Sequence, residues 1–259
     1  MPELGKEVDE VPAGKVPVGK VPVGKVPENS GEKVDYKFDY KSDYKEKELT
    51  FREDKISFSD GRETYNIMMD WETPIMKRSA EWVTTEGRAL SVLEIGYGMG
   101  IAAGLIQAYS PDVHTIIELH PDIVERAEVF AADRNKFFSS DKRTAHKKVE
   151  VIGGKDWFGE FQKSFEQSKL RQYHAVFIDT YNDNNLDKIK DYITKILAPG
   201  GRMTWWNPMQ DSIPDVKTQG KRGLTYERIK MSDHKVVVPY NKYHTTDTYW
   251  MPKYQRPLK

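Results

Sequence analysis

From residue 90 onward, short β-branched runs alternate with longer amphipathic stretches, and this alternation constrains the fold more than any other feature. The runs predict strands at 90–95, 113–119, 149–152, 175–179 and 202–206, and the stretches between them predict helices near 100–109, 121–134, 157–168 and 185–197. Strands that alternate with helices pair in parallel as βαβ units. Two later runs, 235–240 and 245–251, are expected to pair antiparallel at one sheet edge. The sequence therefore predicts an α/β fold with a doubly wound, mostly parallel, seven-stranded sheet.

The first 48 residues differ in composition from the rest of the chain. Residues 11–30 repeat a VPxGK-like pentamer, and residues 35–45 repeat Asp-Tyr-Lys at four-residue spacing. Proline and glycine in each pentamer disfavour helix and sheet, and the Asp-Tyr-Lys units provide no apolar face. We expect residues 1–48 to be a disordered, low-complexity tail, either merely solvated or partner-binding, and residues 49–259 to form one domain.

Composition excludes several classes of protein. The 40 Lys and Arg residues balance 40 Asp and Glu residues, so no global charge favours nucleic acid or an anionic membrane. The absence of cysteine excludes disulfides, thiolate metal sites and thiol nucleophiles, and no metal ligand set is predicted. No stretch has the length of a membrane span, and the amino terminus lacks the apolar core of a signal peptide. We expect a cytoplasmic protein that binds a small molecule. The sequence does not reveal its oligomeric state.

A glycine-rich turn follows the first predicted strand of the sheet. Gly96, Gly98 and Gly100 form a G-x-G-x-G turn that leads directly into a predicted helix. Glycines let the backbone bend sharply and approach a ligand that a Cβ would block. The spacing is shorter than in the G-x-G-x-x-G fingerprint that binds a pyrophosphate, which argues against a dehydrogenase. It favours a ligand with a zwitterionic amino acid tail.

The next two predicted strands end in residues suited to a nucleoside. Glu118 follows the glycines by about twenty residues, where a strand-end carboxylate accepts hydrogen bonds from ribose hydroxyls. Gly154 and Asp156 follow the third strand, where a carboxylate accepts from an adenine amino group and glycine admits the ring. A solvated strand-end acid at Glu118 is the alternative.

Two acids are candidates for the reaction centre. Asp179 ends the fourth strand, at the sheet edge where open α/β proteins place their chemistry. Glu72 lies upstream of the first strand, and two carboxylates suit a planar cation with several N–H donors. Because a guanidinium has a pKa above about 12, an acceptor must orient it and take a proton during any reaction at nitrogen. Alternatively, Glu72 is a first-turn helix acid and Trp71 is a core residue.

Taken together, these blocks resemble the guanidinoacetate N-methyltransferases and the related protein-arginine δ-N-methyltransferases of fungi. The shared blocks are Met-x-x-Trp-Glu-Thr-Pro-x-Met (68–76), Leu-Glu-Ile-Gly-Tyr-Gly-Met-Gly (93–100), Ile-Ile-Glu (116–118), Asp-Thr-Tyr (179–181) and Leu-Ala-Pro-Gly-Gly (197–201). They cover nearly all of the chain from about residue 60 onward, in the order and spacing of the family. The resemblance implies a Rossmann-like class I methyltransferase that uses S-adenosyl-L-methionine.

The resemblance also implies residue roles. Glu72 and Asp179 would be catalytic and would bind the guanidinium. The cofactor would contact Met69, Gly96, Gly98, Met99, Glu118, Gly154, Asp156 and Asp179. The acceptor would contact Glu72, Trp71, Tyr181 and Asn207.

The chain departs from the family after the fifth strand. In guanidinoacetate enzymes, backbone N–H groups at this point bind the substrate carboxylate, but here Asn207 is followed by Pro208, which has no N–H. His-Pro-Asp at 120–122 is more similar to the arginine δ-N-methyltransferase branch. A guanidino acceptor other than guanidinoacetate is therefore favoured.

Two other functions remain as alternatives. Asp-Thr-Tyr-Asn at 179–182 loosely resembles the Asp-Pro-Pro-Tyr turn of nucleic-acid amino-methyltransferases, which would make the acceptor another amine. A base substrate would need a basic face or a recognition domain, and neither is evident. A non-catalytic Rossmann-like binding module with a partner-recruiting tail would bind the cofactor without turnover.

Overall fold

The computed structural model describes residues 44–84, 91–166, 171–181, 192–207, 224–239 and 243–258. Several predictions fall outside these residues. They concern the VPxGK repeat, the first two Asp-Tyr-Lys units, most of the helix at 185–197, and the chain from 208 to 223.

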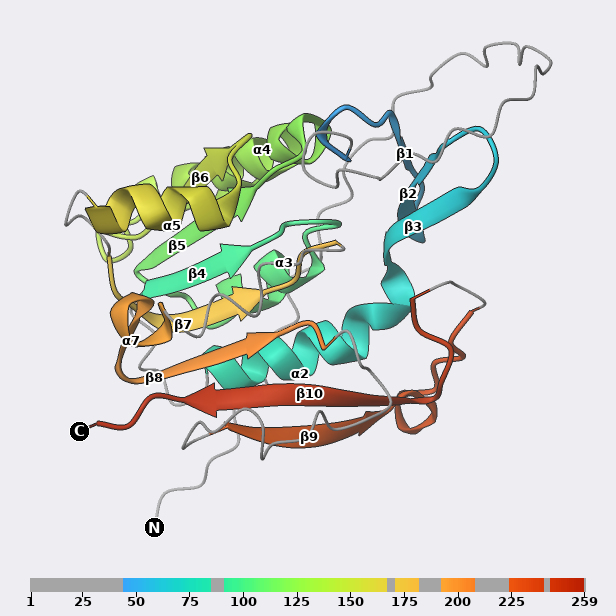
Figure 1. The fold of residues 1–259 in the computed structure, drawn as a ribbon. Coiled ribbons are helices and arrows are strands. Elements are labelled where there is room, and N and C mark those ends of the chain that lie inside the picture. Colours follow the sequence, from blue (N-terminus) through green and yellow to red (C-terminus); the bar gives the residue numbers. More distant parts are fainter. Residues whose placement is uncertain are drawn as a thin grey trace. The chain divides into compact units, whose positions relative to one another are not determined.

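Seven strands form the main sheet, in the order β6-β5-β4-β7-β8-β10-β9 (Figure 1). Their bounds are β4 Ser91–Ile95, β5 Val113–Glu118, β6 Lys148–Gly153, β7 Tyr173–Ile178, β8 Leu197–Trp205, β9 Leu224–Lys230 and β10 Thr248–Gln255. The strands from β4 to β8 pair in parallel, and β10 pairs antiparallel with both β8 and β9. The predicted doubly wound, mostly parallel, seven-stranded sheet is confirmed.

Helices cover both faces of this sheet, as a parallel sheet requires. On one face, α2 (Thr73–Thr84), α3 (Ile101–Gln107) and α4 (Pro121–Ser139) pack on side chains such as Val92, Ile116 and Phe177. On the other face, α5 (Trp157–Glu166) and α7 (Ile193–Ile196) pack on the alternate side chains, such as Leu93 and Ile178. Among the helices that the structure describes, none has the length and apolar character of a membrane span.

The predicted partner of the last strand was wrong. The run at 235–240 was expected to pair with the next run, but β9 is formed by Leu224–Lys230, and none of the residues 235–239 lies in a strand. Lys235 has φ of 59° at the end of the 3-10 helix η2 (Met231–His234), and Val237 is 88% exposed. A residue in the left-handed region ends an extended run, and Pro239 cannot donate to a strand ladder. The β-branched run is therefore a connection outside the sheet, in which Val236 and Val238 pack against the core and Val237 faces solvent.

A smaller antiparallel sheet precedes the main one. It contains β1 (Leu49–Phe51), β2 (Lys55–Ser59) and β3 (Thr64–Met69), and the 3-10 helix η1 (Asp70–Glu72) connects it to α2. The residues before it, 44–48, are here called the entry segment. Tyr44 in this segment is 3% exposed and its ring packs on His120 and Tyr181. The packed chain thus begins earlier than the predicted start at residue 49, within the last Asp-Tyr-Lys unit.

The strand order reverses between β4 and β7. The chain after β4 and the chain after β7 meet at this switch point, where α/β proteins form their binding crevice. Asp179 N–H donates to the Ile95 carbonyl at 2.8 Å, and Gly96 N–H donates to the Ile117 carbonyl at 2.8 Å. Gly96 has φ of 87°, and a Cβ at this residue would lie 1.9 Å from the Asp179 carbonyl oxygen. The glycine is therefore required by the close approach of Asp179.

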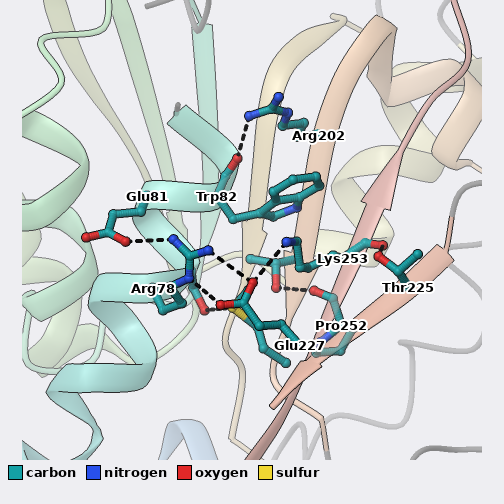
Figure 2. Close-up of polar contacts among 11 residues, drawn as sticks. Arg78, Glu81, Trp82, Arg202, Thr225, Glu227, Pro252 and Lys253 are labelled. Atoms are coloured by element: carbon teal, nitrogen blue, oxygen red, sulfur yellow. Dashed lines mark hydrogen bonds and ion pairs between the residues drawn. The ribbon is translucent and has the colours of Figure 1, made fainter. Parts of the chain in front are cut away.

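A charged cluster joins α2 to the antiparallel edge of the sheet (Figure 2). Arg78 of α2 donates from Nε and Nη2 to the Glu227 carboxylate of β9, and Lys253 of β10 donates to the same carboxylate at 2.9 Å. Lys253 and Arg202 also lie over the Trp82 ring, at 4.1 and 4.6 Å from its centroid. Because α2 follows η1 directly, the cluster lies on the helix that begins next to Glu72.

We expect Glu227→Gln to lower the free energy of unfolding by about 1 kcal/mol, because it removes the charge that two cations share in a partly screened site. Urea unfolding at low salt measures this loss, which should shrink at 1 M salt. Asp141→Asn is the matched control, since the Asp141–Arg143 pair is far more exposed and should change little. Equal effects from both substitutions would contradict a structural role for the cluster.

We expect Gly96→Ala to lower the free energy of unfolding by more than about 2 kcal/mol. The new Cβ would overlap the Asp179 carbonyl, and alanine is also strained at a positive φ. Gly104→Ala is the control, because Gly104 lies in α3 with nothing within 4 Å of a new Cβ. That substitution should be neutral or stabilising by up to about 1 kcal/mol. If Gly96→Ala lowers the free energy of unfolding no more than Gly104→Ala does, the backbone around residue 96 accommodates a Cβ and the prediction is wrong.

Candidate functional site

Glu72 and Asp179 form a pair of enclosed carboxylates at the switch point. Glu72 is 3% exposed, whereas Asp179 is partly accessible. Burial, followed by the charge of Asp179, raises the pKa of Glu72 from 4.5 to about 8. Burial, followed by the charges of Glu94 and Glu118, raises the pKa of Asp179 from 3.8 to about 7. The two acids thus lie in a negative environment that favours a bound cation.

Aromatic rings surround the Glu72 side of this pair. Trp71 stacks on His244 at 5.1 Å between ring centroids, and the Tyr243 ring lies 6.3 Å from Trp71. Trp206 contacts Tyr243 at 6.1 Å and Tyr249 at 4.9 Å. The rings come from η1, from the end of β8, and from β10 with the residues before it. Together they form a wall beside Glu72, here called the aromatic wall, and ring faces of this kind can attract a cation.

Glu118 ends β5 beside the loop that contains Gly96, Gly98 and Gly100, here called the glycine loop. Its Oε1 accepts from the N–H groups of Leu119 and His120 at 2.7 and 2.9 Å, and its Oε2 accepts from Tyr97 N–H at 2.8 Å. A carboxylate has about four acceptor positions, so Oε2 has capacity for one more donor. Hydrogen bonds from ribose hydroxyls to Glu118 stay a prediction, and the described backbone donors leave one acceptor position on Oε2 for them.

The glycine loop is covered by a methionine that sequence reasoning assigned no site role. Met99 N–H donates to the Met68 sulfur at 3.2 Å, and a Cβ on Gly98 would lie 2.4 Å from that sulfur. The neighbouring residue Met69, and not Met68, was predicted to contact the cofactor. The structure buries its side chain in the core, and its N–H donates to Glu72 at 2.7 Å.

Another buried acid, Glu94, lies under the loop. Glu94 of β4 is fully buried, and its Oε2 is 2.8 Å from Nε2 of the buried His114 on β5. The Gln107 amide lies 3.0 Å from Nδ1 of His114. If Gln107 donates to Nδ1, the proton of the ring is on Nε2 and faces Glu94. Burial raises the pKa of Glu94, and His114 opposes this rise.

The residues that follow β6 differ in their surroundings: Gly154 has open space beside it, whereas Asp156 and Trp157 contact residues of α5. Gly154 has φ of 68° and open space where a Cβ would lie. Asp156 Oδ2 accepts from Gly159 N–H at 3.3 Å, so this side chain caps the first turn of α5. Trp157 is 4% exposed and packs on Phe158 and Phe161.

The entry segment crosses the carboxyl ends of the three strands β5, β6 and β7. Tyr44 contacts His120 after β5 and Tyr181 after β7, and Lys45 Nζ donates to the Gly154 carbonyl after β6 at 3.1 Å. His120 Nε2 donates to the Lys47 carbonyl at 2.9 Å, and its Nδ1 accepts from Asp122 N–H. His120 therefore caps α4 and anchors the entry segment.

Two predicted acceptor residues have other partners. Tyr181 contacts Tyr44 and Phe58, on the side of the entry segment. Asn207 is 1% exposed; its N–H donates to Tyr249 Oη at 2.7 Å, and its Nδ2 donates to the Trp250 carbonyl at 2.9 Å. Trp71, in contrast, lies in the aromatic wall beside Glu72, and its contact with an acceptor stays a prediction.

Sequence reasoning missed Tyr243 and His244. Tyr243 Oη donates to Glu72 Oε1 at 2.6 Å, and His244 is 1% exposed beside Trp71. Neither residue belongs to a motif, and only the aromatic content near the carboxyl terminus marked this region. Within the described ranges, no group of three or more His, Asp and Glu residues is arranged to bind a metal ion.

Residues 40–215 match the family described as guanidinoacetate N-methyltransferase. Protein arginine N-methyltransferase 2 of Candida glabrata is 26% identical over 225 residues, which cover 79% of this chain and 50% of that protein. The protein of the same name from Gibberella zeae is 32% identical over 149 residues, which cover 54% of this chain and 32% of that protein. The chain thus spans half or less of the length of these relatives.

A solved O-methyltransferase from Bacillus cereus, in complex with SAH, is 17% identical with a TM-score of 0.47, covering 70% of this chain and 80% of that one. The family match extends from the entry segment through the glycine loop to the residues beyond β8, and it includes both Glu72 and Asp179. The chain belongs to the guanidinoacetate N-methyltransferase family.

Proposed function

We propose that the chain is an S-adenosylmethionine-dependent N-methyltransferase whose acceptor is a guanidinium group bound between Glu72 and Asp179. The observation that carries this proposal is the pair of enclosed carboxylates beside an aromatic wall. Two acids with raised pKa values need a cation to be ionised together, and a guanidinium offers N–H donors to both.

The residues along the strand ends fit the cofactor. Gly96 and Gly98 bring the backbone to where a Cβ would collide with Asp179 or with the Met68 sulfur, and Gly154 leaves open space for a ring. Glu118 has capacity for a hydroxyl donor, and the acids Glu118 and Asp179 favour a positively charged sulfonium nearby. When bound, the cofactor supplies an electrophilic methyl group.

The proposed chemistry uses this chain's two acids in different ways. Glu72 accepts two hydrogen bonds on one oxygen and is held rigidly, so it orients the acceptor. Asp179 is partly accessible, and its pKa near 7 suits a proton acceptor at neutral pH. As the nitrogen takes the methyl group, Asp179 receives the proton that the guanidinium loses, and the methylated product keeps one positive charge.

The surroundings of Asn207 support an arginine-like acceptor over guanidinoacetate. The Asn207 N–H is engaged by Tyr249, and Pro208 has no N–H to offer a substrate carboxylate. The similarity to proteins named protein arginine N-methyltransferase 2 agrees with this choice. The acceptor is therefore a guanidinium on a longer side chain, in a free compound or a protein.

A turnover assay with methyl-labelled S-adenosylmethionine tests this assignment. Guanidinoacetate, arginine, agmatine, lysine and an arginine-containing protein serve as acceptors. We expect label on arginine-like compounds and little on guanidinoacetate or lysine, and Asp179→Asn should lower turnover by about 100-fold or more while SAH still binds. Asp133→Asn, on the exposed face of α4, is the control. Label on lysine alone would favour another amine, and SAH binding without any labelled acceptor would favour a binding module.

We expect Glu72→Gln to stabilise the ligand-free protein as pH rises. The pKa of Glu72 is about 8 in the folded protein and 4.5 ordinarily, so the folded state retains a proton that the unfolded chain releases between these values. Stability of the wild type therefore falls through this window, whereas glutamine has no proton to lose. Glutamine also keeps an oxygen for the Met69 and Tyr243 donors.

Urea unfolding from pH 5 to pH 9 measures this difference. The advantage of Glu72→Gln over the wild type should grow with pH and level off above about 8, and Glu128→Gln on the exposed face of α4 is the control. A constant advantage across the range would mean that Glu72 is not the buried acid described.

A further inference from the structure

One oxygen of Glu72 receives two donors. Met69 N–H donates to Oε1 at 2.7 Å, and Tyr243 Oη donates to the same oxygen at 2.6 Å. No described residue donates to Oε2. The two donors therefore fix the plane of the carboxylate and leave its second oxygen for a ligand.

Tyr243 is itself held by its neighbours. Its ring stacks on Trp71 with an interplanar angle of 26° and meets Trp206 edge-on at 69°. The next residue, His244, is buried between Trp71 and Tyr249. Because the ring is packed between indoles, the hydroxyl cannot leave Glu72 without disturbing the aromatic wall.

The hydroxyl also acts on the charge of Glu72. Burial and the charge of Glu72 raise the pKa of Tyr243 far above 10, so its hydroxyl stays a donor at any working pH. A donor to a carboxylate favours the ionised form, and Tyr243 opposes the effects of burial and Asp179 on the pKa of Glu72. Loss of the hydroxyl would leave Glu72 both less oriented and less ionised.

We propose that Tyr243 is a positioning residue of the acceptor site, whose hydroxyl holds Glu72 with Oε2 turned toward the guanidinium. This inference rests on the proposed function. It extends that function to a residue outside every motif, contributed by the connection between η2 and β10.

The test is Tyr243→Phe, which keeps the ring and removes the hydroxyl. We expect KM for the arginine-like acceptor to rise about tenfold or more, because a hydrogen bond to a charged group is lost, while SAH affinity is unchanged. Tyr65→Phe is the matched control, since its hydroxyl donates to Asp60 at 3.0 Å on the exposed β2–β3 hairpin. It should leave KM unchanged.

A double-mutant cycle separates positioning from general packing. If Tyr243 acts through Glu72, Tyr243→Phe should add little to the KM effect of Glu72→Gln. Full additivity of the two effects would overturn the inference, because it would mean that the hydroxyl acts independently of Glu72.

A titration that needs no turnover completes the test. In protein labelled with ¹³C at glutamate carboxyls, the Glu72 signal is assigned by its loss in Glu72→Gln. Its midpoint should move to higher pH in Tyr243→Phe and stay in place in Tyr65→Phe. If the midpoint moves but KM does not, or if neither moves, the positioning role is overturned. If the wild type methylates no guanidino acceptor, the proposed function fails, while the titration still decides whether Tyr243 sets the state of Glu72.

Discussion

Glu72 and Asp179 are held together in a part of the protein where neither charge is well solvated. Their raised pKa values mean that the ligand-free protein bears an electrostatic cost near neutral pH, and that a bound cation relieves it. The rest of the structure serves to keep the two acids in place despite their repulsion. Asp179 is fixed by its backbone bond to Ile95 and by the close approach of Gly96. Glu72 is fixed by Met69 and Tyr243.

The two acids come from parts of the fold with different origins. Asp179 lies at the switch point of a parallel sheet, where the topology alone opens a crevice. Glu72 lies outside the sheet, on the turn η1 between the small sheet and α2, and nothing in the sheet topology places it. Its position depends on how α2 packs, and the cluster of Arg78, Glu227 and Lys253 joins α2 to β9 and β10. The element that follows Glu72 is thus joined to the antiparallel edge of the sheet.

The sequence predicted the parts of the protein that depend on local backbone rules. Glycines 96 and 98 are needed for a turn and a close approach, and the β-branched runs of β4, β5 and β7 are buried on both faces, so both features are visible in the sequence. The last strand pair was misplaced for a physical reason. Leu224–Lys230 contains three charged residues and one buried side chain, Ile229, because β9 is the edge strand of the sheet, whereas 235–239 is β-branched but begins with a left-handed Lys235 and contains Pro239.

Sequence reasoning could not find the residues that join distant segments. The tyrosine of the last Asp-Tyr-Lys unit looks like its two predecessors, yet Tyr44 is buried because His120 and Tyr181 happen to flank it. Tyr243 reaches Glu72 only through the packing of Trp71 and Trp206. Motifs report where the backbone must bend around a cofactor, but the acceptor side is built from long-range contacts between rings. The residues that surround Glu72 therefore have the weakest local signal, and they are found only by following the hydrogen bonds of Glu72 and the ring contacts around it.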